Sequence, residues 1–89
     1  MAGRSRQFKG YTLNVVDDGV RAVAKTGEHV GYLIVRPNNV IEDVAVDAKH
    51  QEKGIASAML KFGRQFRPIE HDLESNMTPS GHGWAQANP

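Results

Sequence analysis

The 89-residue sequence has no cysteine. Disulfide bonds, thiolate metal sites and a cysteine nucleophile are therefore excluded. Long apolar runs are missing as well: no stretch approaches the ~18 apolar residues that a membrane-spanning helix needs, and there is no apolar signal-peptide core. We therefore expect a cytoplasmic protein that does not interact with membranes.

Charge of one sign is not in excess, since 11 Lys and Arg residues oppose 10 Asp and Glu residues and leave a net charge of +1. This balance gives no general electrostatic reason to expect nucleic acid as a partner. The four histidines lack the HxH or HxxxH spacing of metal ligands, so no metal site is expected.

Residues 1–9 are polar and basic and contain Arg4, Arg6 and Lys9. They are predicted to form a flexible arm. Three positive charges with Phe8 as the lone aromatic residue are weak evidence for a nucleic-acid-binding surface. Residues 10–89 are predicted to form one small domain, near the size at which a single hydrophobic core is marginally sufficient.

Four segments have the composition of β-strands, namely residues 11–16, 20–25, 29–35 and 40–47. The first alternates apolar and polar residues, and the third is the most apolar run of the chain. Asp17-Asp18-Gly19 contains the Asp-Gly pair typical of a hairpin turn. Because all connections are short, the strands are predicted to form an antiparallel meander.

Residues 55–66 are predicted to form an amphipathic helix whose apolar stripe packs on the sheet. The stripe consists of Ile55, Met59, Phe62 and Phe66. After the helix, residues 68–71 are expected to form a brief further strand, and Thr78-Pro79 to begin a short C-terminal helix. The predicted fold class is α+β: a mostly antiparallel sheet of four or five strands, one main helix and a short last helix.

The connection between the last long strand and the main helix has the features of a phosphate-binding loop. The first amides of a helix have no intrahelical partner and, with the helix dipole, carry roughly half a positive charge. Gly54 would let an anion approach the backbone, and Lys53 adds a full charge. The spacing fits neither a Walker loop nor the three-glycine dinucleotide fingerprint. The alternative is an ordinary strand–turn–helix connection in which Gly54 permits a tight turn.

The same stretch resembles the acetyl-coenzyme A site of the GCN5-related N-acetyltransferases (GNAT), whose signature is Q/R-x-x-G-x-G/A. Gln51, Gly54 and Ala56 fill its three defined positions. The resemblance covers roughly residues 20–66 and implies a truncated acyl-CoA N-acyltransferase fold with acetyl-CoA as cofactor. The tail, with His71, Thr78, Gly81, Trp84 and Ala85, resembles that of small phage-encoded members.

The resemblance also implies which residues bind the cofactor. The pyrophosphate would lie against the loop residues Gln51, Glu52, Lys53, Gly54, Ile55 and Ala56. The backbone of Val44 and Val46 would pair with the pantetheine arm, much as an added β-strand would. Asn76 matches the asparagine at the beginning of the family's last helix.

Acetylation of an amine needs a base for the amine and an acid for the departing thiolate. Glu42 is the predicted base, because alternation places it on the face of Val44 and Val46; the alternative is a carboxylate that only faces water. The tail lacks the family's usual tyrosine, and Trp84 stands near its position. His71 is the predicted substitute, with His82 as a second choice, since imidazole titrates in the useful range. A surface histidine without a role is the alternative.

The family usually has two helices between its first two strands, and Asp17-Asp18-Gly19 replaces them here. The acceptor side should therefore be open, which suits an exposed amine of a protein. Two functions are consistent with the sequence: an N-acetyltransferase acting on a protein, or a catalytically degenerate GNAT-fold interaction protein with a host-interaction or virion-accessory role. Exposed strand edges in so short a sheet also allow a homodimer.

Overall fold

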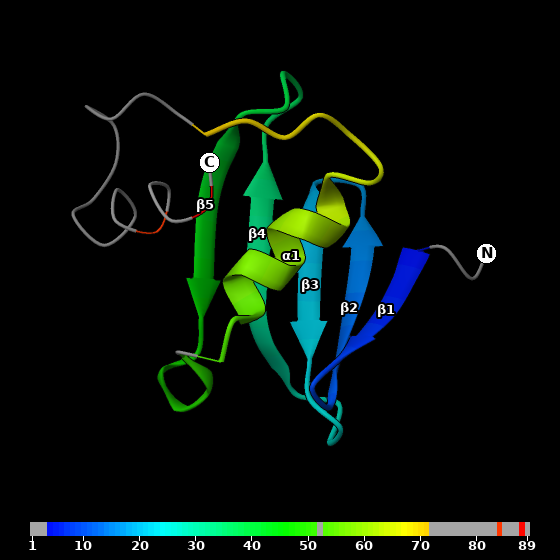
Figure 1. Ribbon diagram of the computed structural model, residues 1–89, viewed down its shortest axis with the longest axis vertical. Helices are drawn as coiled ribbons and strands as arrows, with labels where there is room; N and C mark the ends of the chain where they lie inside the picture. Colours follow the sequence, from blue (N-terminus) through cyan, green and yellow to red (C-terminus); the bar gives the residue numbers. More distant parts are fainter. Residues whose placement is uncertain (1–3, 52, 72–83, 85–87, 89) are drawn as a thin grey trace.

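The computed structural model describes residues 4–51, 53–71, 84 and 88. Its five strands form one antiparallel sheet in sequential order (Figure 1). The elements are β1 (Ser5–Phe8), β2 (Tyr11–Val16), β3 (Gly19–Val23), β4 (His29–Val35), β5 (Ile41–Val46), the 3-10 helix η2 (Ala48–His50) and the helix α1 (Ile55–Gly63). The predicted α+β class and antiparallel meander are confirmed, and the four predicted strands agree with β2 to β5 within two residues.

Within the segment predicted to be a flexible arm, residues 5–8 form strand β1, which corrects the prediction for these residues. Lys9 and Gly10 both have positive φ, 47° and 86°, which is the geometry of a two-residue hairpin turn that pairs Phe8 with Tyr11. Gln7 donates from Nε2 to Thr12 Oγ1 at 2.8 Å across the pair. A polar edge strand held in this way lacks the apolar alternation by which strands are recognised in a sequence.

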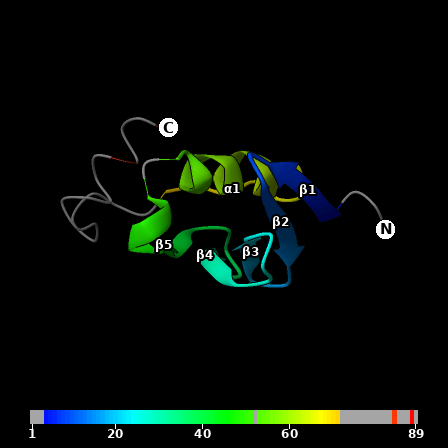
Figure 2. The ribbon, with the colours of Figure 1, turned by 90° about the horizontal axis from the view of Figure 1, so that it is seen from below.

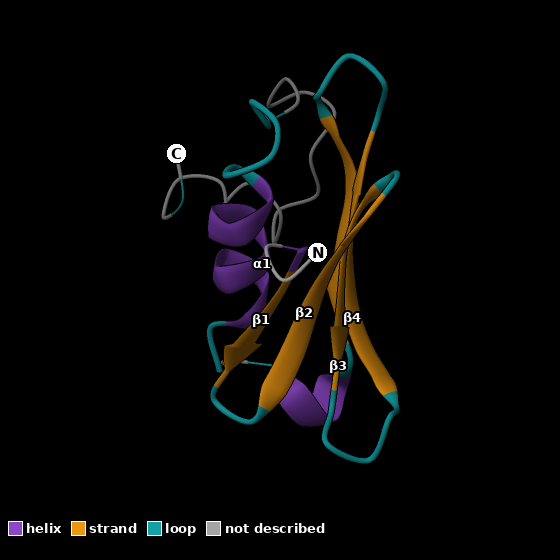
Figure 3. Ribbon diagram, turned by 90° about the vertical axis from the view of Figure 1, so that its right-hand side faces the viewer, coloured by secondary structure: helices purple, strands orange, loops and turns teal. Residues whose placement is uncertain are grey.

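Helix α1 lies diagonally across one face of the sheet (Figure 1), and the edge views show the helix and the sheet as two layers (Figures 2 and 3). The apolar side chains of both layers form one core, in which Leu13, Leu33, Ile55 and Met59 are at most 1% exposed. Phe66, which was predicted to belong to the helical stripe, is 40% exposed. The helix ends at Gly63, and Phe66 therefore leaves the register of Ile55, Met59 and Phe62.

The strand predicted for residues 68–71 is reduced to an isolated parallel bridge between Glu70 and Val40. Ile41 N–H donates to the Glu70 carbonyl, and Glu70 N–H donates to the Asn39 carbonyl. The beginning of the predicted last helix at Thr78 lies outside the described residues. Within those residues, no helix combines the length and apolar character needed to cross a membrane.

Arg67 connects the end of the α1 segment to two turns of the sheet. Its Nε donates to Asn39 Oδ1 at 2.7 Å, and its other nitrogens donate to the carbonyls of Arg36 at 3.0 Å and Asp17 at 3.3 Å. The half-buried guanidinium thus holds the β2–β3 and β4–β5 turns against the chain that leaves the helix.

We predict that Arg67→Ala lowers the free energy of unfolding by about 2 kcal/mol, because hydrogen bonds from a charged donor are lost and carbonyls are left with fewer partners. The midpoint of thermal unfolding, followed by circular dichroism, should fall by about 8–16 °C for a domain of this size. Lys25→Ala, at an exposed turn, is the matched control and should leave the midpoint nearly unchanged. An Arg67→Ala variant as stable as the control would contradict this role.

On the face of the sheet opposite α1, Tyr32 donates its hydroxyl to Asp43 Oδ2 at 2.9 Å. This hydrogen bond and the negative charge of Asp43 raise the pKa of Tyr32 above its ordinary value of 10.0, against a smaller opposing effect of Arg21. The stabilisation from this bond is present below the unfolded-state pKa of about 10 and is lost as the pH rises through the higher folded-state pKa.

We predict that Asp43→Asn lowers the pKa of Tyr32 toward 10.0, because both causes of the shift are removed or weakened. The measurement is a titration of phenolate absorbance, with Tyr32→Phe as the reference that isolates this tyrosine from Tyr11. Asp47→Asn removes another exposed carboxylate near β5 and should leave the titration unchanged. Equal pKa values in the wild type and Asp43→Asn would refute the assignment.

Candidate functional site

The predicted motif lies where β5 leads through η2 into α1, at one end of the sheet (Figure 1). Asp47 N–H donates to the Val30 carbonyl at 2.7 Å, and His50 N–H donates to the Asp47 carbonyl at 2.8 Å. The Tyr11 hydroxyl lies 2.6 Å from His50 Nδ1, and the two rings meet edge to face. These bonds fix the beginning of the loop against β2 and β4.

The helix N-terminus has the features predicted for an anion site. Gly54 is its N-cap residue and has φ 81°, a conformation that favours glycine. No side chain caps the helix and its first turn has no acidic residue, as far as the structure describes this region. The first amides, from Ile55 to Ser57, precede the intrahelical bond from Ala58 N–H to the Gly54 carbonyl.

The loop side chains contribute in different ways. Lys53 is exposed, and neither ion pair of the described residues includes it. Ile55 is 1% exposed, so only its backbone amide can face a ligand. Gln51 donates from Nε2 to the Val46 carbonyl at 3.0 Å and thereby ties the motif to the end of β5. Ala56 is half-buried, and Glu52 lies outside the described residues.

The outer edge of β5 exposes the backbone of Val44 and Val46, the two residues predicted to pair with the pantetheine arm. Asp47 N–H points toward β4, since it donates to Val30. Residues of an antiparallel strand alternate in the direction of their backbone groups, so Val46 and Val44 direct theirs away from β4. Their half-buried side chains pack on the core. Apart from the Glu70 bridge at its beginning, this edge has no strand partner among the described residues.

Glu42 lies in a β-bulge. Asp43 pairs with Ile34 and Ile41 with Val35, so Glu42 is the extra residue of β5. The regular alternation that placed Glu42 on the face of Val44 and Val46 is therefore wrong at this position. The Glu42 side chain is 58% exposed, and its Oε1 lies 3.7 Å from Arg36 Nε.

His71 follows Glu70, so it lies at the same end of β5 as Glu42, away from the motif loop. Its ring packs edge to face against Trp84, and its Nε2–H donates to the Asn88 carbonyl. The Trp84 indole N–H is buried and has no acceptor among the described residues. The predicted residues thus form two groups, with the phosphate loop at one end of β5 and the two catalytic candidates at the other. Asn76 and His82 lie outside the described residues.

The Tyr11–His50 pair and the bulge at Glu42 were not predicted. A contact between residues 39 positions apart has no local sequence signal. The bulge adds one unpaired residue to β5, and no glycine or proline in the sequence indicates where it occurs. Tyr11 could be predicted only as a core-facing residue of an alternating strand.

One of the comparisons with known proteins found a match. The model of the Acetyltransferase (GNAT) family matches residues 4–66. No curated protein and no solved structure matched the chain. A match that begins just before β1 and ends beyond α1 includes the whole strand–loop–helix unit and most of the chain, and this protein therefore belongs to the GNAT acetyltransferase family.

Proposed function

We propose that the protein uses acetyl-CoA to acetylate an exposed amine of another protein. The observation that carries the proposal is the juxtaposition of an uncapped helix N-terminus at Gly54 with the outward backbone of Val44 and Val46. The first suits a pyrophosphate, and the second suits an extended, amide-containing arm. When bound, acetyl-CoA would supply the acetyl thioester for the reaction.

The residues that would hold the cofactor are those of the loop and of the β5 edge. The amides of Ile55 and Ala56 would donate to the pyrophosphate, and Lys53 would add a mobile charge. Gln51 would act as a strut through its bond to Val46 rather than as a direct ligand. From Val46 to Glu42 the edge extends four residues, about 13 Å, so Glu42 stands at its far end.

Glu42 would accept the proton of the incoming amine at its carboxylate. More than half of its side chain is exposed, so an amine on the surface of another protein can reach it. The bulge turns this residue out of the regular strand, which is a common use of bulges beside active sites. The β2–β3 connection is only the turn at Asp17 and Asp18, which leaves no helix there to enclose a small amine.

A binding protein with the same fold is the second candidate. The observation that favours it is the contact of His71, the predicted proton donor, whose Nε2–H is already donated to the Asn88 carbonyl. In that case acetyl-CoA would bind without turnover, and the protein would act through its interactions.

The cofactor site is tested by a thermal-shift titration with acetyl-CoA, with ATP and NAD as controls. Ligand at about one hundred times its dissociation constant stabilises the native state by about 2.7 kcal/mol. In a small domain this corresponds to a rise of about 10–20 °C in the unfolding midpoint. We expect Gly54→Glu to abolish the rise, because its side chain would crowd and repel the pyrophosphate.

Gly27→Glu is the matched control for that experiment. Gly27 also has positive φ, 89°, and a Cβ there would meet no atom within 4 Å, so it carries the backbone strain without touching the motif. An equal acetyl-CoA shift in Gly54→Glu and Gly27→Glu would disprove the assigned cofactor site.

Glu42→Gln separates catalysis from binding. Loss of a general base typically lowers the rate by about 10²–10⁴-fold, so we expect kcat for acetylation of an acceptor protein to fall in that range. The acetyl-CoA thermal shift should stay at the wild-type value, as should both readouts in Glu28→Gln, at an exposed turn. Undiminished turnover by Glu42→Gln would exclude Glu42 as the base; a wild-type protein that binds acetyl-CoA but transfers nothing would favour the binding function.

A further inference from the structure

The second free edge of the sheet, at β1, combines unpaired backbone with positive charge. β1 pairs only with β2 in the described part of the chain. Because the two-residue turn makes Phe8 and Tyr11 a hydrogen-bonded pair, alternation directs the backbone groups of Ser5 and Gln7 outward. A polypeptide in extended conformation can add to such an edge.

The side chains beside this edge are cationic. Arg4, Arg6 and Lys9 are exposed, and neither ion pair of the described residues includes them. Arg6 lies over the ring of Phe62 at 5.5 Å, and Arg4 lies 6.0 Å from the ring centre of Phe66. The aromatic rings hold the two guanidinium groups on the α1 side of β1.

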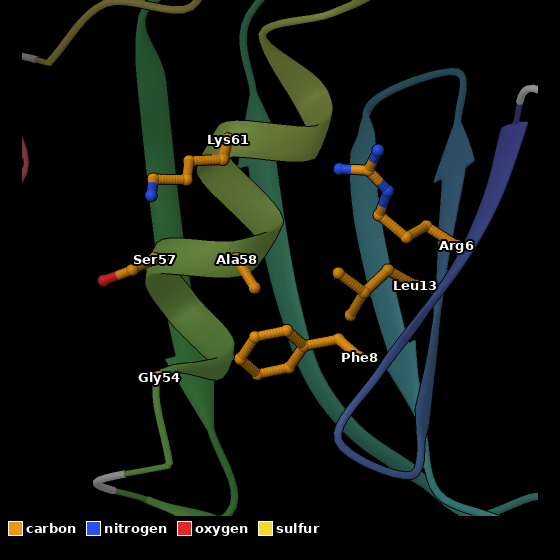
Figure 4. Close-up of a pocket in the computed structure, with 7 residues that line it drawn as sticks. All are labelled: Arg6, Phe8, Leu13, Gly54, Ser57, Ala58 and Lys61. Carbon is orange, nitrogen blue, oxygen red and sulfur yellow. The ribbon is translucent and has the colours of Figure 1, made fainter.

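A pocket of about 290 Å³ lies between β1 and α1. Figure 4 shows Arg6 and Phe8 reaching from β1 toward the helix, with Leu13 behind them, whereas Ser57 and Lys61 are directed away from β1. Phe8, Leu13 and Ala58 give this pocket an apolar wall next to the Arg6 charge. An aliphatic side chain on the α1 side of an added strand could enter it.

We propose that β1 is a docking edge for an extended acidic segment of a partner protein, which adds as a sixth strand with acidic residues facing Arg4 and Arg6 and an aliphatic residue in the pocket. The identification of this partner as the acceptor protein rests on the proposed function. Acidic residues two positions apart in a strand share one face and repeat every ~6–7 Å. Arg6 in β1 and Arg4, the residue just before β1, are likewise two positions apart.

Two other occupants fit less well. A second copy pairing through β1 would bring arginines of both chains together, which is destabilising. A nucleic acid has no strand backbone, so it would not pair with the outward amides and carbonyls of β1 in the alternating pattern of a sheet.

The test uses a fluorescein-labelled peptide, Thr-Val-Thr-Glu-Thr-Glu-Thr, and fluorescence anisotropy at low salt, without acetyl-CoA. Gln7→Pro removes one outward N–H but leaves the backbone hydrogen bonds between β1 and β2 intact, since proline is tolerated at such an edge position. Gln7→Thr keeps the backbone N–H and, like Gln7→Pro, lacks the Nε2 donor that bonds Thr12, so it is the matched control. We expect Gln7→Pro to weaken peptide binding more than tenfold and Gln7→Thr less than twofold.

The contribution of charge to peptide binding is tested independently by a double variant, Arg4→Gln and Arg6→Gln. This variant should bind the peptide about fivefold more weakly, and an increase in salt should have a similar effect on the wild type. Lys25→Gln should have no effect. Equal binding by the two Gln7 variants, equal binding of a peptide with lysine in place of glutamate, or tighter binding of oligo-thymidylate would each overturn the proposal. Peptide binding by a protein that transfers no acetyl group would refute the proposed function and leave the docking edge standing.

Discussion

The packing of α1 on the sheet is the interaction on which the candidate site depends. Ile55 is the first residue of the helix and is 1% exposed, so the N-terminal turn is held by the core and cannot fray freely. A nine-residue helix would be marginal in water on its own. The same burial that stabilises the helix therefore fixes the direction of its first amides. Gly54, with positive φ, lets the chain enter that buried turn from the exposed loop.

Different side-chain contacts hold the two ends of β5, and the strand edge between these ends stays open. At the loop end, Tyr11 contacts His50, and Gln51 donates to Val46. At the other end, Arg67 connects the turns next to the Glu70 bridge. In both places side chains hold the chain: Tyr11 contacts the ring of His50, whereas Gln51 and Arg67 donate to backbone carbonyls. The β5 edge therefore needs no neighbouring strand in order to be positioned.

The sequence was most informative where one local rule decides the structure. The bounds of β4 and the beginning of α1 were predicted because apolar density and Gly54 mark them. The end of α1 was not, since Phe66 continues the stripe in sequence although the helix ends at Gly63. β1 and the bulge at Glu42 depend on pairing between strands, which alternation within one strand cannot reveal. The roles of Glu42, His71 and Asn76 stay predictions.

In the described part of the chain, α1 is the only helix that covers the five-stranded sheet. The opposite face of the sheet is compatible with water because polar side chains pair across neighbouring strands. Ser5 donates to Asn14, Gln7 to Thr12 and Tyr32 to Asp43, on pairs of neighbouring strands. A second layer of helices is therefore not required for this face to be stable. Because the candidate cofactor site uses only the α1 N-terminus and the β5 edge, a chain can lose the enclosing helices and keep that site, and the surfaces left open become available to a macromolecular partner.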